Sequence, residues 1–417
     1  DTKPTLVVCP ASLVYNWTAE LERFAPSLDV CAIVGAKAQR RVQIAGAAEH
    51  NVVVTSYDLM RRDIDEYAER DFARVVLDEA QYIKNPLTQV ARAAKRLPAG
   101  VRFALTGTPI ENRLSELWSI FDFLMPGLLG TRESFAKRFE SPVEHAEGDS
   151  AARLQALVSP FVLRRVKEDV VADLPEKIED TVMAQLTGEQ RKLYLANQDR
   201  IAQQVQHREA TEFKKDKLKV LAELTKLRQI CCDPHLHYED YKSGSAKLDA
   251  CMELVHGAID GGHHILLFSQ FTGMLDIIGK RLAKEDIAFL KLTGASSKES
   301  RAKMVAQFQA GEVPVFLISL KAGGVGLNLT AADVVIHYDP WWNVAAQDQA
   351  TDRAHRIGQQ HTVTVYKLIA KDTIEERIMQ MQESKRDLVN SVLGGDGISS
   401  ALFSREDVLA LLGGDGR

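Results

Sequence analysis

The sequence has few cysteines, no long apolar run and no excess of basic residues. Its 417 residues include five cysteines and no CxxC pair, which disfavours a disulfide framework or a zinc ribbon and suits a reducing cytosol. No apolar run approaches the roughly 18 residues of a membrane-spanning helix, and no signal peptide opens the chain. The net charge of −5 excludes a general basic field, so any contact with nucleic acid must be local.

The sequence also lacks a phosphate-binding loop of the form GxxxxGK[ST], whose backbone amides and lysine hold terminal phosphates. The nearest match, Gly273 to Gly279 followed by Lys280, is one residue too long and starts inside a predicted helix. If the chain acts on a nucleotide, this element is not among its residues.

Apolar and charged residues make up 45% and 26% of the chain, which is typical of a folded globular protein, and 417 residues are too many for one ordinary core. The first third alternates helices with short, uniformly apolar segments. These segments predict a parallel sheet covered on both faces, with ligands at the carboxyl ends of its strands. They are TLVVC (Thr5–Cys9), VVV (52–54), VVL (75–77) and RFAL (102–105).

Strand-like sequence nearly disappears between Pro126 and Leu236, where helical, charge-rich sequence predicts an insertion or linker. Apolar segments then return and predict a second α/β domain of similar size. They are Ile265–Phe271, Ile287–Leu292, Val315–Leu320, Val334–Asp339 and Val363–Ile369. The last region predicts an amphipathic helix with an apolar stripe formed by Ile374, Ile378, Met381, Leu388 and Val392.

The stretch CCDPHLH (Cys231–His237) contains residue types that bind zinc. Vicinal cysteines rarely chelate one ion together, and no second ligand pair follows at a fitting distance. The preceding LTKLRQI predicts an amphipathic helix, so we favour buried packing at a helix end.

Acidic residues come directly after the apolar segment 75–77. In DEAQ (Asp78–Gln81), Asp78 could orient a hydrated magnesium ion and Glu79 could polarise an attacking water, because a hard cation prefers carboxylate oxygen and keeps several waters. A solvated strand end is the alternative for DEAQ taken alone. A second polar strand end, LTGTP (Leu105–Pro109), favours the ligand site.

Two arginines lie three residues apart in QDQATDRAHRIGQ (Gln347–Gln359), a spacing that puts Arg353 and Arg356 on one face of a predicted helix. Fixed guanidinium groups suit the spread charge of a phosphoryl group in transfer, where one such arginine contributes roughly 10³- to 10⁵-fold in rate. A solvated basic face is the alternative. The glycine-rich KAGGVGLNL (Lys321–Leu329) shortly before it would allow close backbone approach to a ligand, or would form a plain tight turn.

Several segments together resemble the motifs of the SWI/SNF-type ATPases, a branch of helicase superfamily 2. They are DEAQ, LTGTPIENRLSELWS, FVLRRVKEDVVADLPEK, LRQICCDPHL, SLKAGGVGLNLTAADVVIHYDPWWN and QATDRAHRIGQ. The resemblance covers nearly the whole chain, and its last three segments are specific to that branch. It implies an α/β fold of two RecA-like parallel-sheet lobes at 1–125 and 241–370, a helical insertion and linker at 126–240, and a C-terminal bracing helix and tail at 371–417.

The resemblance implies an ATP-dependent motor that moves along double-stranded DNA without separating the strands, with ATP and Mg²⁺ bound between the lobes. The implied catalytic residues are Asp78, Glu79, Arg353 and Arg356, with Asp78 meeting the metal largely through water. The implied ATP contacts are Gln81, Gly324, Gly326, Asn328 and Gln347. The implied coupling residues are Thr106, Gly107, Thr108, Trp341 and Trp342, and the implied DNA contacts are Pro10, Ser12, Thr55, Ser269 and Gln270.

For some of these residues a purely structural role is the alternative. Ser12 and Thr55 could serve a helix cap or a turn. Trp341 and Trp342 could be core anchors, as paired tryptophans often are.

In the SWI/SNF-type ATPases the phosphate-binding loop precedes a segment like TLVVCPASLVYNW, where this sequence begins. We therefore expect a fragment of an ATPase that does not hydrolyse ATP by itself. The expected partners are duplex DNA and a protein complex on it, such as RNA polymerase or a nucleosome, for a monomer in a bacterial nucleoid or a eukaryotic nucleus. An RNA helicase of the same superfamily and a non-catalytic DNA- or protein-binding module are the alternatives.

Overall fold

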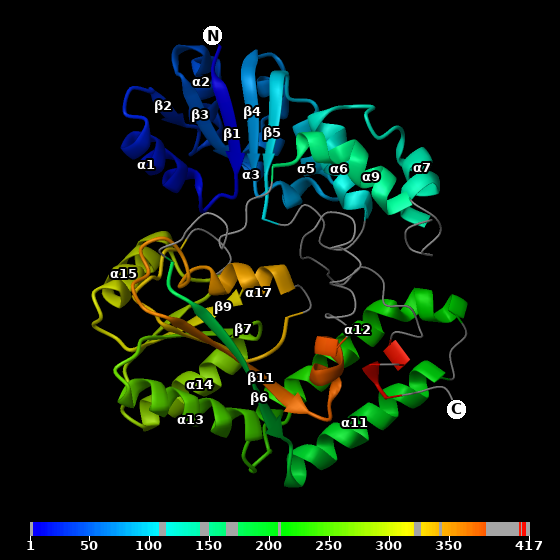
Figure 1. The fold of residues 1–417 in the computed structure, drawn as a ribbon, viewed down its shortest axis with the longest axis vertical. Helices are drawn as coiled ribbons and strands as arrows, with labels where there is room; N and C mark the ends of the chain where they lie inside the picture. Colours follow the sequence, from blue (N-terminus) through cyan, green and yellow to red (C-terminus); the bar gives the residue numbers. More distant parts are fainter. Residues whose placement is uncertain are drawn as a thin grey trace. The chain divides into compact units, whose positions relative to one another are not determined.

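The computed structural model describes residues 3–107, 114–141, 150–163, 174–206, 210–320, 327–341, 344–380, 408–409 and 411–413. The chain divides into two compact units: the described residues up to Leu163 belong to the first unit, and those from Leu174 onward belong to the second (Figure 1). Each unit contains its own parallel sheet, as the sequence predicts. Within the described residues, no helix combines the length and the apolar character needed to span a bilayer.

The sheet of unit 1 has the strand order β2-β3-β1-β4-β5, and all its strand pairs are parallel. The strands are β1 (Thr5–Cys9), β2 (Val30–Ala32), β3 (Val52–Ser56), β4 (Phe72–Asp78) and β5 (Ala99–Leu105). The four predicted strands are confirmed, and β2 is the strand that the sequence did not announce. Every residue of β3 is buried, which explains its uniformly apolar start.

The helices of unit 1 flank this sheet. They are α1 (Val14–Phe24), α2 (Lys37–Ala45), α3 (Tyr57–Arg62), α4 (Ile64–Ala68), α5 (Gln89–Lys95), α6 (Leu114–Leu124), α7 (Arg132–Phe135) and α9 (Ser150–Val158). The side chains of Ser56 and Thr88 accept backbone N–H groups at the starts of α3 and α5. Ser12 makes no such bond, because α1 begins after Leu13, so the cap suggested for Ser12 is wrong.

Strand β5 lies at one edge of the unit 1 sheet, and one of its faces is open. Val101, Phe103 and Leu105 are 51%, 45% and 42% exposed. On the other face, Arg102 donates hydrogen bonds to the carbonyl oxygens of Leu97 and Phe123. The expectation of a sheet covered on both faces is therefore wrong for this strand.

The sheet of unit 2 has the order β6-β11-β10-β7-β9-β8 and is also parallel. Its strands are β6 (Lys177–Gln185), β7 (Ile265–Ser269), β8 (Phe289–Leu292), β9 (Val315–Ser319), β10 (Val334–His337) and β11 (Val363–Lys371). All five predicted strands are present. The edge strand β6 was not predicted and falls inside the stretch expected to be helical.

The helices of unit 2 are α11 (Gly188–Gln206), α12 (Ala210–Cys232), α13 (Ala246–Asp260), α14 (Thr272–Lys284), α15 (Lys298–Gln309) and α17 (Val344–Thr351). Cys231 and Cys232 end α12 and are both fully buried. This confirms the prediction of packing at a helix end.

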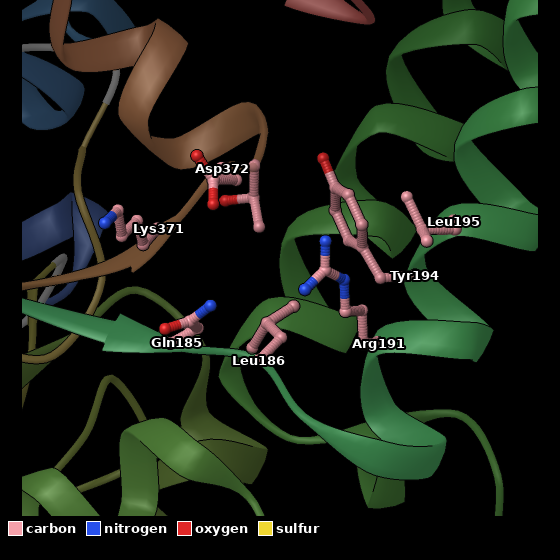
Figure 2. A pocket seen from close by; sticks show the side chains of 8 residues that line it. Gln185, Leu186, Arg191, Tyr194, Leu195, Lys371 and Asp372 are labelled. Carbon is pink, nitrogen blue, oxygen red and sulfur yellow. The ribbon is translucent and has the colours of Figure 1, made fainter.

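Residues 374–380 form a helix in unit 2. Ile374 and Ile378 are buried in one cluster with side chains of α11 and α12. Lys247 and Glu375 form an ion pair of 2.8 Å whose two side chains are 0% exposed. Figure 2 shows Tyr194 of α11 near this segment, where its hydroxyl accepts a 2.7 Å bond from the backbone N–H of Ile374. Three other residues of the predicted stripe, Met381, Leu388 and Val392, lie outside the described residues.

Candidate functional site

Asp78 is the last residue of strand β4, and its carboxylate accepts hydrogen bonds from two directions. The indole Nε1 of Trp17 donates to Oδ2 at 2.8 Å, and the backbone N–H of Glu79 donates to Oδ1 at 2.9 Å. The hydroxyl of Tyr57 donates to the Asp78 carbonyl at 2.8 Å. Two N–H donors on opposite oxygens fix the plane of this half-buried carboxylate.

Glu79 has a left-handed backbone, with φ 52° and ψ 54°, which is uncommon for a residue other than glycine and is found at functional sites. Its Oε2 accepts a 2.7 Å bond from Gln81 Nε2, and Gln81 Oε1 accepts a 2.9 Å bond from the hydroxyl of Thr106. A continuous chain of hydrogen bonds therefore joins the end of β5 to Glu79.

The groups that surround Asp78 stay neutral. Burial, and then the charge of Asp78, raise the pKa of the Cys9 thiol to about 12. Burial also raises the pKa of Tyr57, with a smaller contribution from Asp78. At neutral pH the Cys9 and Tyr57 side chains therefore add no negative charge beside Asp78.

The carboxylates of Asp78 and Glu79 fit a hydrated magnesium ion better than a metal bound directly by several side chains. Among the described residues, no group of three or more His, Cys, Asp or Glu side chains could hold a metal ion. Mg²⁺ in proteins commonly keeps several waters and uses one or two carboxylates with substrate phosphates. A carboxylate with a fixed plane, such as Asp78, can orient that water shell.

The other predicted residues of unit 1 differ in their exposure. Ser12 is exposed in the turn after β1, and Gly107 is exposed after β5. Pro10 is buried. Thr55 is 0% exposed and its hydroxyl donates to the Ile33 carbonyl at 3.2 Å, so its side chain lies in the sheet and forms neither a cap nor a turn. Thr108 lies outside the described residues.

In unit 2, a cluster at the ends of β7 and β10 is organised by Asp339. The hydroxyl of Ser269 donates to Asp339 Oδ1 at 2.5 Å, and Gln270 Nε2 donates to Oδ2 at 2.6 Å. Ser269 is 0% exposed, whereas Gln270 is partly exposed. The sequence predicted both residues but not the buried carboxylate that joins them.

Arg228 of α12 completes this cluster and was also missed. It is 1% exposed, its Nη1 donates to Gln270 Oε1 at 3.2 Å, and its Nη2 donates to the Pro340 carbonyl. Its guanidinium lies 5.8 Å from the ring centre of Phe271. An arginine within the apolar face of LTKLRQI was the available signal, because a buried guanidinium needs several acceptors.

Arg353 and Arg356 do not share a helix face, so that prediction is wrong. Helix α17 ends at Thr351, and both arginines lie in the turns that follow. The Arg353 carbonyl accepts a 3.0 Å bond from the backbone N–H of Leu329, which competes with continued helix. Arg353 is partly buried and Arg356 is exposed.

The remaining predicted residues of unit 2 are Gln347, Trp341, Asn328, Gly324, Gly326 and Trp342. Gln347 is 7% exposed, and its Oε1 accepts a 3.3 Å bond from the backbone N–H of Trp341. The Trp341 side chain packs against a buried cluster, which favours a core anchor at this position. Asn328 is exposed. Gly324, Gly326 and Trp342 lie outside the described residues.

A separate small pocket lies at the ends of β6 and β11 beside α11 (Figure 2). Its cavity of about 30 Å³ has room for about two water molecules, far too little for a nucleotide. It is lined by Gln185, Leu186, Arg191, Tyr194, Leu195, Lys371, Asp372 and Thr373. None of the predicted site residues is among them.

Comparisons with known proteins agree with the motifs. The SNF2-related domain family matches residues 1–236, more than half of the chain. This chain is a member of the SNF2-related family. A second family, the helicase conserved C-terminal domain, matches residues 246–358. The predicted relation to SWI/SNF-type proteins of helicase superfamily 2 is confirmed.

Relatives of this SNF2-related chain occur in bacteria and archaea. It is 39% identical over 409 residues to an uncharacterized ATP-dependent helicase of Mycoplasma pneumoniae, covering 98% of this chain and 39% of that protein. It is 39% identical to the putative ATP-dependent helicase/translocase YwqA of Bacillus subtilis, covering 97% and 44%. A solved structure, the Sulfolobus solfataricus SWI2/SNF2 ATPase core in complex with dsDNA, is 36% identical and matches over 98% of this chain and 84% of that chain, with a TM-score of 0.47. The chain spans less than half the length of the two curated relatives.

Proposed function

We propose that the chain is the motor portion of an ATP-dependent translocase that moves along double-stranded DNA without separating its strands. The observation that carries this proposal is the bonded chain from Thr106 through Gln81 to Glu79, beside the fixed carboxylate of Asp78, in a member of the SNF2-related family. Relatives named as ATP-dependent helicases support the ATPase activity. ATP and Mg²⁺ are the proposed cofactors, and duplex DNA is the proposed partner.

Within this proposal each acidic residue has a distinct role. Asp78 orients the water shell of the cation, and Glu79 polarises the attacking water. A bound Mg²⁺ would neutralise phosphate charge during transfer. Because Gln81 bonds both Glu79 and Thr106, a shift of the β5 end would turn the Glu79 carboxylate. This is a direct route by which movement of the loop after β5 could control hydrolysis.

Arg353 and Arg356 of unit 2 are proposed to stabilise phosphate charge during ATP hydrolysis. In the longest product of the gene, replacing Arg356 by alanine should lower the DNA-stimulated kcat roughly 10³-fold, because transition-state charge would lose a fixed cation. The matched control is Arg191→Ala, which removes an exposed arginine of the same unit beside the small pocket. A rate within a factor of about two of the wild type would remove Arg356 from the proposal.

The phosphate-binding loop is proposed to come from residues outside these 417, which contain no GxxxxGK[ST] segment. Within the described residues, the outer edge of β5 has no strand partner, and Phe103 and Leu105 are exposed. An added parallel strand would cover this edge. The loop at its carboxyl end would then lie beside Thr106, at the chain of bonds that leads to Glu79.

Measurement of phosphate release tests whether the phosphate-binding loop comes from residues outside these 417. The 417-residue chain should hydrolyse ATP at no more than a trace rate, with or without duplex DNA. The longest product of the gene should be stimulated by duplex DNA. Vigorous DNA-stimulated turnover by the 417-residue chain would contradict the proposal, and stimulation by RNA alone would favour an RNA helicase.

DNA is proposed to contact the exposed turn at Ser12 and the partly exposed Gln270. The burial of Thr55 and Ser269 restricts these two side chains to supporting roles. Fluorescence anisotropy should show affinity that falls steeply with salt and is equal for unrelated duplexes, because phosphate contacts carry no sequence information. Ser12→Asp should weaken binding, while Ser27→Asp, at another exposed serine of unit 1, should not. Strong preference for one sequence would contradict a translocase.

A further inference from the structure

Trp17 makes a contact with the site that its position in the sequence does not announce. Its indole has one N–H donor and no acceptor, and that donor is used on Oδ2 of Asp78 at 2.8 Å. A hydrogen bond to an ionised carboxylate is stronger than one between neutral groups. The bond therefore fixes the orientation of the carboxylate from the side opposite the Glu79 N–H.

The helix that carries Trp17 buries little of its own surface. Val14 is the one residue of α1 that is buried, while Tyr15 and Phe24 are 53% and 70% exposed. Trp17 itself is half-buried. Because α1 buries little apolar surface, the indole bond is one of the contacts that position it against the end of β4.

The same helix begins at the turn that is proposed to meet DNA. The backbone N–H of Leu13 bonds the Pro10 carbonyl at 2.8 Å, which closes the turn, and Ser12 is exposed on it. Ser12 lies two residues before the start of α1, and Trp17 lies in the first turn of that helix. A displacement of the turn would shift the start of α1 and, through this continuous helix, the indole.

We propose that Trp17 is a positioning residue that transmits DNA contact at the Pro10–Leu13 turn to the metal-orienting carboxylate of Asp78. DNA bound at the turn holds α1 in place, and the indole N–H then keeps Asp78 in the orientation that suits the water shell of the cation. This inference rests on the proposed function. It goes beyond it by naming the bond through which DNA acts on the nucleotide site.

The first test uses the indole N–H signals of the 417-residue chain, which has four tryptophans, in a nitrogen–proton correlation spectrum. Trp17→Phe identifies one signal by its loss. Asp78→Asn should move that signal, because a charged acceptor becomes neutral. The matched control is Trp118, whose Nε1 donates to the Gly130 carbonyl at 3.0 Å in the same unit and whose signal should not move. A Trp17 signal that Asp78→Asn leaves unchanged would overturn the proposal.

The second test adds duplex DNA to the same sample while anisotropy reports binding. DNA should move the Trp17 signal in the wild type and should move it less in Ser12→Asp. Binding that leaves the Trp17 signal in place would overturn the transmission and leave the proposed function intact. Absence of binding would overturn both.

The third test measures magnesium dependence in the longest product of the gene. Trp17→Phe keeps an aromatic ring and loses the donor, and it should raise the Mg²⁺ concentration for half-maximal DNA-stimulated hydrolysis about tenfold, as loss of such outer contacts does. Trp118→Phe should leave that concentration unchanged. An equal fall in rate at all Mg²⁺ concentrations would indicate a purely structural role for Trp17 and would count against the proposal.

Discussion

The edge strands β5 and β6 differ in how far they are protected against pairing with a further strand. On β6, Glu179 accepts bonds from Lys177 and Lys367 at 2.8 and 2.6 Å, so charged groups occupy the edge. On β5, the exposed face carries only the apolar side chains of Val101, Phe103 and Leu105. Natural edges are commonly protected by charge, and an apolar edge invites a further strand. β6 thus has the character of a true sheet edge, whereas β5 has the character of an inner strand.

Self-association of the 417-residue chain is the largest effect that this comparison predicts. Sedimentation velocity at micromolar concentrations should detect oligomers, because the open edge of β5 can pair with another copy. Phe103→Lys should return the chain to monomers. Ile178→Lys, on β6, is the matched control and should leave the oligomers in place. A wild-type chain that stays monomeric throughout would show that the apolar edge is not adhesive.

Unit 2 should lose stability in acid. Burial, and then the charge of Lys367, lower the pKa of His337 in unit 2 to about 3, against an ordinary value of 6.5. In the unfolded chain His337 therefore binds a proton below pH 6.5, whereas in the folded chain it does not. Stability falls as the pH drops from 6.5 toward 3. Between pH 7 and pH 5 the loss should be about 2 kcal/mol.

Urea unfolding at pH 7 and pH 5 checks this loss. His337→Gln should remove most of the loss in unit 2, because glutamine does not titrate. His361→Gln, at an exposed position of the same unit, should keep it. An equal pH response in wild type and His337→Gln would mean that His337 is protonated in the folded state.

The smallest expected effect concerns the charges on β6. Burial by itself would raise the pKa of Glu179, but the bonds from Lys177 and Lys367 outweigh it and lower the pKa to about 2. The resulting stability is present above pH 4.5 and is lost as the pH falls from 4.5 toward 2. Since about a third of this side chain is exposed, solvent screening reduces its contribution at pH 7 to about 1 kcal/mol.

Glu179→Gln should therefore lower the free energy of unfolding at pH 7 by about 1 kcal/mol. Glu312→Gln, at an exposed position of the same unit, should change it by less than about 0.5 kcal/mol. Indistinguishable variants would show that the charges on β6 protect the edge without stabilising the sheet.

The sequence predicted the sheets better than their edges. Buried parallel strands such as β3 and β9 are apolar throughout, so composition alone reveals them. KIEDTVMAQ in β6 carries charge on both faces, because an edge strand is half exposed, and it gave no strand signal. The exposed face of β5 was equally hidden, since an apolar segment reads the same whether or not a neighbour covers it.

In the candidate sites, local patterns succeeded where one segment decides the geometry and failed where distant segments do. DEAQ at the end of β4 follows from the strand and the turn. The end of α17 before Arg353 depends on a bond from the backbone N–H of Leu329 to the Arg353 carbonyl. The helical pattern of the local sequence does not reveal a bond to such a distant residue. Trp17 lies in a segment whose pattern indicates an apolar helix face, and such a pattern does not reveal where an indole N–H points.

The buried pair of Lys247 and Glu375 sets a limit on how far this polypeptide can be trimmed. Burial alone would lower the pKa of Lys247, but the Glu375 carboxylate outweighs it and raises the pKa. A stop codon or protease cut before residue 375 would leave an uncompensated ammonium in the interior, at a cost of about 3 to 5 kcal/mol. Shortened versions made for crystallisation, or fused to a reporter, should therefore retain Glu375.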